Sequence, residues 1–418
     1  MANKTLLSHT SHQVIVVLLS ILVQLPLAAF LGHYYDQRLF LQTGYLVSSG
    51  LSPYQPYDIT VFQANLHLIG VNPVIGYPPL WPLLLGFIYR LTYNIVPDLF
   101  LYNLASKIPI IISNIALAYT TKNIMQHHNF PTQKIKFAWL FLLFNPFILL
   151  TTTAWGEFDT TIALLSVAGL YLLSKGMVGK SALLLSLGFV LKPISLPLLG
   201  LPLLFCLPKN RERKLIYSLI VVGVVLSLGF AIFFLLNWPP PLAADQVTSF
   251  FKMSGGMTLF SIVELCQVSA TLPIGFEVLG FLWIPALVLG YVIISRHPPK
   301  SLAELMQAAV ALLLIFFLSR SWLSEPNVNH LLPLMLILLG FGKISLRSLH
   351  STWIITFIFM ILNLGFFQLF FLIEPSIMIW MWTWSSQIDT VRLILRFSVA
   401  LLWTIFASKL LIDIQRRV

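Results

Sequence analysis

The chain has 418 residues, of which 58% are hydrophobic and only 9% are charged. An ordinary globular domain is about 25% charged, so this composition excludes a water-soluble protein and indicates one that lies in a membrane. The formal net charge of +11 does not indicate nucleic-acid binding, because in a membrane protein an excess of Lys and Arg first reports which loops face the cytoplasm.

Apolar runs recur along the whole chain, and a run of roughly 17 to 25 residues can cross a hydrocarbon core about 30 Å thick. They lack the two-residue alternation of a barrel strand, so we predict helices. We therefore expect an all-α polytopic membrane protein, a single transmembrane domain over residues 1–418 with about twelve spans. In chain order these are predicted near 14–31, 98–121, 135–154, 158–174, 180–192, 194–208, 215–237, 278–295, 303–319, 330–342, 350–373 and 391–412.

A polar stretch over residues 33–79 follows the first predicted span and is expected to form a large first outer loop. The apolar segment 80–91 at its end is predicted as a juxtamembrane or re-entrant helix. If that segment crossed the membrane, the connection containing Lys122 and Lys134 would lie outside, against the excess of basic residues expected in cytoplasmic loops. This arrangement places both termini in the cytoplasm.

The acidic residues follow the opposite pattern. Among the 14 in the chain, those on the predicted cytoplasmic side are few: Glu212, Glu304 and Asp413.

The predicted spans 180–192 and 194–208 are too short to cross the membrane alone at about 1.5 Å per residue. Charge and non-helical backbone are tolerated at membrane depth where protein or water surrounds them. We therefore predict an outer vestibule with Lys192 and Pro193 at its floor.

The first candidate group belongs to the first outer loop. Tyr35, Asp36 and Arg38 come directly after the first predicted span, and Asp58 and Tyr77 follow later in the loop. A carboxylate beside a wet cavity can act as a general base towards a hydroxyl group. An interfacial tyrosine belt with a surface ion pair accounts for the same residues equally well, so both interpretations stay open.

Two further groups lie near the predicted vestibule. Trp155, Glu157 and Asp159 stand where one predicted span ends and the next begins, and the two carboxylates could bind a metal, position sugar hydroxyls or cap the following helix. Capping explains Asp159 better than Glu157. Lys192 is a lone cation in an apolar run, which suits a phosphate-binding point charge, although a lysine that snorkels from a helix end is the alternative.

The fourth group is a polar outer loop over residues 319–330. Arg320 is suited to phosphate, and His330 at the start of the next helix could donate to a phosphate as well. Glu325 and Asn327 lie between them. A connecting loop without function has the same composition, so this alternative also stays open.

The order and spacing of these motifs resemble the GT-C superfamily of membrane glycosyltransferases. The resemblance rests on an acid just past the first helix, on the sequence GLSPY at residues 50–54, and on YPPL at 77–80 leading into a short helix. The stretch 145–159, followed by Lys-Pro at 192–193 and Leu-Pro at 196–197, is similar to the branch that depends on polyprenol-phosphate mannose, including relatives of GPI mannosyltransferase I.

This resemblance covers residues 14–208, which we expect to be a GT-C-like catalytic module, while 209–418 is expected to be a more variable transmembrane module. It implies a GT-C-type bundle and an inverting transfer of a sugar, in this branch mannose. The implied donor is a polyprenyl-phosphate-linked sugar, and the implied acceptor is a glycolipid or glycan. The active site would face the outer or lumenal side, at the plasma membrane of a prokaryote or the endoplasmic reticulum of a eukaryote.

The resemblance also implies roles for individual residues. Asp36 matches the first-loop acid that acts as the general base. The family's Asp-x-Asp pattern reads Asp36-Gln37-Arg38 here, which leaves Arg38 to face the donor phosphate; a divalent metal is left open but is not predicted. We assign to the donor phosphate Arg38, Lys192, Arg320 and His330. We assign to the sugar and acceptor pocket Tyr35, Asp58, Tyr77, Trp155, Glu157, Asp159, Glu325 and Asn327.

Two other classes of protein compete with an enzyme. A transporter or flippase of lipid-linked sugars would share the span count and the charges near the helices. However, the long first outer loop makes the two halves of the chain unequal. Many transporter folds contain a duplicated half, and none is visible in this sequence. A non-catalytic subunit of a glycosylation complex is the third class. The sequence shows no nucleotide-sugar fingerprint, so we predict a lipid-linked donor with membrane lipid as a partner and no nucleic acid.

Overall fold

The computed structural model describes residues 2–55, 74–205, 211–240, 242, 244, 252–267, 271–273 and 275–416, with side chains from residue 12 onward. The longer helices are α1 (Ala2–Phe30), α2 (Tyr34–Ser48), α4 (Leu80–Leu91), α5 (Leu99–His127), α6 (Thr132–Phe144), α8 (Asp159–Ser174), α9 (Val178–Leu191), α12 (Arg211–Val224), α16 (Trp283–Arg296), α17 (Leu302–Ser319), α18 (Leu331–Gly340), α19 (Leu346–Leu362) and α21 (Ser376–Gln415). The shorter elements are α7 (Pro146–Ile148), η1 (Leu149–Ala154), η2 (Pro193–Ser195), α10 (Leu196–Leu199), α11 (Leu201–Phe205), η3 (Val225–Ala231), α13 (Ile232–Leu235), β1 (Gly255–Gly256), α15 (Ser261–Gln267), η4 (Glu277–Phe281), β2 (Trp322–Leu323), η5 (Glu325–His330) and α20 (Gly365–Gln368).

The described part of the chain is almost entirely helical, as an all-α membrane protein requires. Seven helical segments in it are long and apolar enough to cross a membrane: His12–Phe30, Leu99–His127, Thr132–Ala154, Arg211–Leu235, Glu277–Arg296, Leu302–Ser319 and Ser376–Gln415. Five apolar segments are shorter: Leu80–Leu91, Asp159–Ser174, Val178–Leu191, Pro193–Phe205 and Leu346–Leu362. The prediction of about twelve spans goes beyond the seven and stays a prediction.

One predicted span corresponds to a helix that is well below crossing length. The span expected near 330–342 contains α18, which has ten residues and so a length of about 15 Å at 1.5 Å per residue. Its residues from Leu331 to Leu338 are all buried. Because protein surrounds this helix, its ends need not reach the two lipid interfaces.

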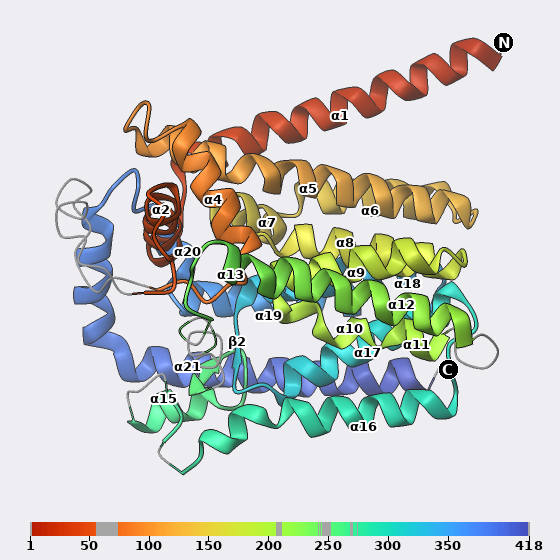
Figure 1. Cartoon of the computed structure of the whole chain (residues 1–418). Helices are drawn as coiled ribbons and strands as arrows, with labels where there is room; N and C mark the ends of the chain where they lie inside the picture. The colour runs from red at the N-terminus through yellow and green to blue at the C-terminus, as the bar shows by residue number, and fades with distance from the viewer. Residues whose placement is uncertain are drawn as a thin grey trace.

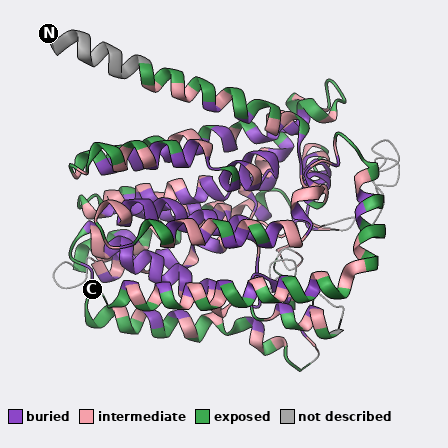
Figure 2. Cartoon of the chain, turned by 180° about the vertical axis from the view of Figure 1, so that it is seen from behind, coloured by how far each residue is buried: buried purple, intermediate pink, exposed green. Residues whose placement is uncertain are grey.

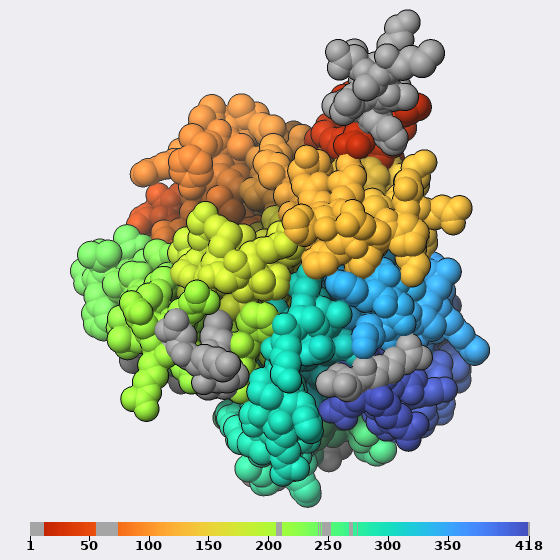
Figure 3. Space-filling view, turned by 90° about the vertical axis from the view of Figure 1, so that its right-hand side faces the viewer, coloured from red at the N-terminus to blue at the C-terminus, as the bar shows by residue number. Residues whose placement is uncertain are grey.

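The long helices run side by side, with both termini at one end of the bundle and α2 at the other (Figure 1). Figure 3, which looks at the bundle from the end that carries the termini, shows α1 at the edge of the bundle, where it packs on α5 and η1. Burial separates inner helices from outer ones (Figure 2): the apolar window of Leu302–Ser319 is 72% buried and that of Arg211–Leu235 only 6%. The outer helices therefore present apolar side chains where lipid would surround them.

In the described part of the chain, one large cluster of buried apolar residues extends from Leu39 to Ile414, and three smaller clusters accompany it. The single transmembrane domain remains a prediction. The predicted modules 14–208 and 209–418 pack against each other, for example where α17 and α18 contact α8. The boundary between the two modules remains a prediction.

The predicted juxtamembrane segment 80–91 forms α4, which packs closely on α2. A Cβ atom added to Gly86 of α4 would lie 2.3 Å from the Val47 side chain of α2, so a glycine is needed where the two helices meet. This pair of helices holds the start of α2, and with it Asp36, at one end of the bundle.

A two-stranded parallel sheet joins two segments that are distant in sequence. Gly255 pairs with Trp322, and Gly256 pairs with Leu323. A Cβ on Gly256, which has φ +58°, would lie 2.2 Å from the Leu323 carbonyl oxygen, so only glycine permits this close pairing. Glu264 of α15 then forms an ion pair with Arg396 of α21 at 2.8 Å. These contacts hold the segment 252–267 beside the end of α17.

Candidate functional site

Helices that would otherwise continue are interrupted near the α2 end. The Asn145 side chain accepts hydrogen bonds from the backbone N–H groups of Phe147 and Ile148 and so begins a new turn after α6. After η1, Gly156 has φ +102°, a conformation that favours glycine, and α8 begins at Asp159. Pro193 ends α9 and holds Lys192 in an extended conformation, as expected before proline.

These interruptions surround a cavity of about 570 Å³, a size that suits a small-molecule site. Nine predicted site residues line it: Tyr35, Asp36, Tyr77, Trp155, Glu157, Lys192, Arg320, Glu325 and Asn327. The remaining lining residues that we discuss are His33, Leu196, Met253, Trp283, Phe316, Trp322, Asn363 and Gln368.

Asp36 lies in the first turn of α2, where the helix dipole favours a negative charge. Its Oδ2 atom accepts a hydrogen bond from Trp155 Nε1 at 2.6 Å. The Nδ1 atom of His33 lies 2.9 Å from the same oxygen, and the His33 ring stacks on the Trp155 ring at 3.9 Å between centroids. Within the described residues, no protein hydrogen bond reaches Asp36 Oδ1, so that oxygen is left for a ligand.

Lys192 is paired with two carboxylates. Its Nζ atom donates to Glu157 Oε2 at 2.8 Å and to Asp159 Oδ2 at 2.7 Å. The Tyr77 hydroxyl donates to Glu157 Oε1 at 3.0 Å. With both acids ionised, the three charged groups sum to one negative charge. Lys192 is therefore neutralised by protein groups, which weakens our assignment of it to the donor phosphate.

Asp159 serves as the common partner of several elements. Besides Lys192, it accepts from Asn327 Nδ2 at 3.1 Å, and His330 Nε2 lies 3.1 Å from its Oδ1 atom. The residue that precedes α8 is Phe158, and no side chain caps this helix. The alternative that Asp159 is a helix cap is therefore wrong, because its carboxylate is directed to tertiary partners instead.

The environment of Glu157 disfavours its charge. Burial is the largest cause, Lys192 opposes it, and the nearby Asp36 and Asp159 carboxylates add to it; together they raise the pKa of Glu157 to about 7. An acid with such a pKa changes its protonation state near neutral pH, so the net charge of this wall of the cavity depends on pH.

Arg320 follows the last residue of α17 and faces the same cavity. Its guanidinium carbon lies 5.2 Å from the centre of the Phe316 ring, and Trp283 and Trp322 line the cavity nearby. Among the described residues, no carboxylate forms an ion pair with Arg320. Burial lowers the pKa of Arg320 to about 10, which still leaves it charged at neutral pH.

Glu325 is a further acid on the cavity wall. Its Oε1 atom accepts a hydrogen bond from Asn363 Nδ2 at 2.9 Å, and burial raises the pKa of Glu325 above its usual value. The asparagine comes from the connection after α19, a segment for which we predicted no function. Glu325 is thus held by a neutral partner rather than by a cation.

Among the described residues, three predicted site residues do not line the cavity: Arg38, Asp159 and His330. Arg38 is two residues after Asp36 on α2, and its guanidinium lies 4.8 Å from the Tyr34 ring centre. His330 lies behind the wall against Asp159. Asp58 lies outside the described residues. Because side chains two positions apart on a helix face different directions, the assignment of Arg38 beside Asp36 at the donor phosphate is not supported by its placement.

Sequence reasoning missed His33 and Lys107. His33 directly precedes the residues that we singled out, but an isolated histidine at a helix start carries no signal of its own. Lys107 is buried in α5 and donates to the backbone oxygens of Leu31 and Ala154, both at 2.6 Å. A lone lysine in an apolar run is the same signal that identified Lys192, and applied to α5 it would have found Lys107.

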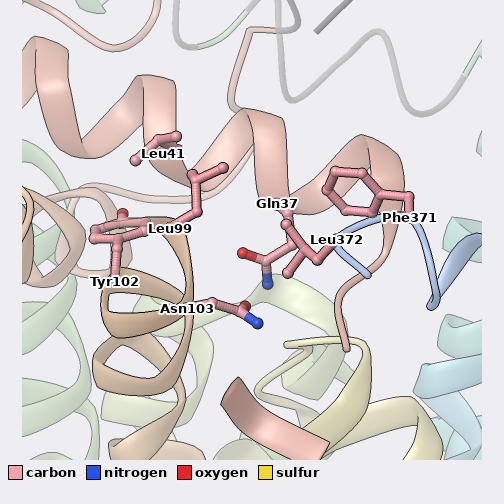
Figure 4. Close-up of a pocket in the computed structure, with 7 residues that line it drawn as sticks. All are labelled: Gln37, Leu41, Leu99, Tyr102, Asn103, Phe371 and Leu372. Carbon is pink, nitrogen blue, oxygen red and sulfur yellow. The ribbon is translucent and has the colours of Figure 1, made fainter. Parts of the chain in front are cut away.

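A second cavity lies on the other side of α2 and is much smaller, at about 10 Å³ (Figure 4). Gln37 and Asn103 point towards each other across it among apolar side chains. Gln37 Nε2 and Asn103 Oδ1 have no protein hydrogen-bond partner. This space is about that of one water molecule, so it suits a structural water and not a substrate.

The described residues contain no group of three or more His, Cys, Asp or Glu side chains arranged to hold a metal ion. No known protein-family model matches this chain. No curated protein matches it either. The functional assignment therefore depends on the chemistry of the cavity.

Proposed function

We propose that the protein is an integral membrane glycosyltransferase that moves a sugar, in our proposal mannose, from a polyprenyl-phosphate donor to a glycolipid or glycan acceptor with inversion. The observation that carries this proposal is that one cavity contains both a carboxylate with an open oxygen, Asp36, and a cation without a carboxylate partner, Arg320. The transfer of a sugar from a phosphate needs one group of each kind.

In this mechanism the acceptor hydroxyl gives its proton to Asp36 Oδ1 as its oxygen forms a bond to the anomeric carbon of the sugar. The bond between that carbon and the phosphate oxygen breaks from the opposite face. The phosphate leaves with the bonding electron pair, and the charge that it gains is stabilised by Arg320. Glu157, held by Lys192 and Tyr77, would accept hydrogen bonds from sugar hydroxyls, while Asp159 lies behind it and holds Lys192 in place.

The lining of the cavity is mixed, as an amphiphilic donor requires. Asp36, Glu157, Glu325 and Asn327 supply polar groups, and Leu196, Met253, Trp283, Phe316 and Trp322 supply apolar surface. In this proposal the sugar contacts the polar groups, the polyprenyl chain contacts the apolar side chains, and the phosphate binds at Arg320.

We also propose that the α2 end of the bundle faces the outer or lumenal side. The opposite end carries both termini (Figure 1) together with basic residues at the ends of helices, such as Lys122 of α5 and Arg296 of α16. An excess of basic residues marks the cytoplasmic side, so the cavity would open away from the cytoplasm.

The test is a transfer assay with purified protein, radiolabelled polyprenyl-phosphate mannose and a crude lipid extract as the source of acceptors. We expect label to appear in a new lipid. If the protein binds the donor or moves it between leaflets without transferring label, the activity is that of a flippase and the proposed transferase function is wrong.

Replacing Arg320 with glutamine should weaken donor binding. One charged hydrogen-bonding group is worth roughly 1.5–3 kcal/mol, so we expect the KM for the donor to rise by about 10-fold to 100-fold. The measurement is a titration of transfer rate against donor concentration. Arg347→Gln is the control, because Arg347 is exposed on α19. An unchanged KM in Arg320→Gln would remove Arg320 from the donor site.

Donor binding should also depend on pH through Glu157. Below its pKa of about 7, Glu157 is neutral and the cavity carries one negative charge less, so an anionic donor should bind more tightly as the pH falls from about 8 to about 6. The change cannot exceed about tenfold per pH unit for one proton. Isothermal titration with the donor at several pH values measures this dependence, and Glu157→Gln should abolish it. A pH dependence that survives in Glu157→Gln would contradict the assignment.

A further inference from the structure

Two helix ends that precede site residues lie against the same helix, α5. Helix α1 ends at Phe30, shortly before Asp36, and η1 ends at Ala154, directly before Trp155. α5 packs against both of these elements. The last carbonyl groups of a helix have no partner within the helix and carry a partial negative charge. Each of the two ends therefore needs a hydrogen-bond donor from elsewhere in the protein.

Lys107 of α5 is a donor to both ends. Its Nζ atom donates to the Leu31 oxygen, just past α1, and to the Ala154 oxygen, the last of η1, at 2.6 Å in each case. Lys107 is only 1% exposed, and among the described residues no carboxylate forms an ion pair with it. A Cβ atom added to Gly156 would lie 3.1 Å from Lys107 Cε, so the glycine leaves room for the lysine. Lys107 is thus directed to two backbone oxygens and not to an acid.

The two segments that Lys107 joins meet again at the candidate site. Trp155 Nε1 donates to Asp36 Oδ2 at 2.6 Å, so the residue that follows η1 orients the carboxylate that lies shortly after α1. This hydrogen bond depends on how far apart the ends of the two elements lie. Lys107 does not itself line the large cavity, but it fixes that separation because one nitrogen atom contacts both ends.

A second buried residue of α5 joins the same two elements in a different way. Asn114 lies about two turns after Lys107 on α5. Its Nδ2 atom is within hydrogen-bonding distance of side-chain oxygens of α1 and η1, at 2.8, 3.1 and 3.0 Å: those of Gln24, Thr152 and Thr153. Asn114 therefore contributes to the packing of α1 on η1 without contacting the backbone at either helix end.

We infer that Lys107 is a positioning residue for the proposed transfer: by holding the Leu31 and Ala154 oxygens on one nitrogen atom, it keeps Asp36 where Trp155 orients its carboxylate. This inference rests on the proposed transferase function, which it deepens by assigning a role to a residue outside the predicted site. It separates the action of Lys107 on the two helix ends from the stability that any buried polar contact contributes.

Lys107→Met keeps the apolar stem of the side chain but has no donor. A misplaced catalytic group can cost about 100-fold in rate, so we expect that loss in kcat, with the KM for the donor changed by less than about threefold. Asn114→Leu is the matched control: it should lower the midpoint of thermal unfolding while kcat stays within about threefold of the wild type. An equal fall of kcat in both variants would overturn the inference, because the loss would then follow stability alone.

A measurement without substrate keeps this inference separate from the proposed function. In protein labelled with ¹⁵N at tryptophan, the Trp155 indole signal is identified by its loss in Trp155→Phe. We expect this signal to move in Asp36→Ala, which removes the acceptor, and to move in the same direction in Lys107→Met, but to stay in place in Asn114→Leu. An unmoved signal in Lys107→Met would overturn the inference. Absence of sugar transfer by the wild type would overturn the proposed function alone.

Lys107→Gln decides the inference if Lys107→Met does not fold. The glutamine nitrogen is one bond closer to the backbone than Nζ, so it cannot reach both oxygens unless the two segments move. We expect a displaced Trp155 signal and a kcat about 10-fold to 100-fold below that of the wild type. A Trp155 signal and a kcat equal to those of the wild type would overturn the inference.

Discussion

Replacing Asp36 with asparagine should lower the rate of sugar transfer by about 100-fold to 10,000-fold, the range that general base catalysis contributes. Asparagine has nearly the same shape and can still accept the hydrogen bond from Trp155 Nε1, but it cannot take a proton from the acceptor hydroxyl. We therefore expect kcat to fall while the protein stays folded. The rate of label transfer under saturating donor measures this effect.

Asp98→Asn is the matched control for this experiment. Asp98 is exposed, and its side chain accepts a hydrogen bond from the backbone N–H of Leu101 at the start of α5, a role that asparagine also performs. The control should keep wild-type activity. Full activity in Asp36→Asn would exclude Asp36 as the base, and Glu325, the other cavity acid without a cationic ion-pair partner among the described residues, would then be tested by Glu325→Gln.

Replacing Lys192 with methionine should destabilise the protein by about 3–5 kcal/mol, the usual cost of removing one partner from a buried ion pair. The substitution leaves the buried carboxylates of Glu157 and Asp159 without their cation. Unfolding of the detergent-solubilised protein, followed by circular dichroism during heating, measures the effect as a lower midpoint. A midpoint equal to that of the wild type would mean that the pairing contributes nothing to stability.

A control and a rescue sharpen this experiment. Lys180→Met removes an exposed lysine from α9, the helix that leads to Lys192, and should leave the midpoint unchanged. The triple variant that adds Glu157→Gln and Asp159→Asn to Lys192→Met removes the two uncompensated charges. It should recover part of the lost stability, because neutral amides cost less to bury than carboxylates. No recovery would locate the cost in packing instead.

The sequence was most informative where a local rule determines the structure. The composition required membrane helices, and Pro193 predicted the break after α9 that holds Lys192 at the cavity. The polar stretch after the first helix, the break near Trp155 and the loop after α17 were each expected to face one vestibule, and the structure brings residues from all three to one cavity. Polar groups interrupting apolar runs are visible in a sequence because lipid makes them costly.

The parts that could not be predicted depend on tertiary contacts. Nothing in the sequence says that Lys192 is shared between two carboxylates and that Arg320 lacks an ion-pair partner among the described residues. Arg38 appeared suitable because it is near Asp36 in sequence, but a helix turns it away. The number of spans also could not be counted from the apolar runs alone. A helix such as α18 is apolar because protein surrounds it, whereas a spanning helix at the edge of the bundle is apolar because lipid surrounds it.

The lining of the cavity comes from distant parts of the chain, and this has a consequence for how the protein could change. The acids Asp36, Glu157 and Glu325 come from outside the segment 253–322, which supplies the apolar side chains of Met253, Trp283, Phe316 and Trp322. The short pairing of Gly255 and Gly256 with β2 joins the two ends of that segment. Substitutions at these apolar positions could therefore adapt the protein to lipid chains of other lengths or saturation while the acids stay in place. A library of variants confined to Met253, Trp283 and Phe316 would explore that range.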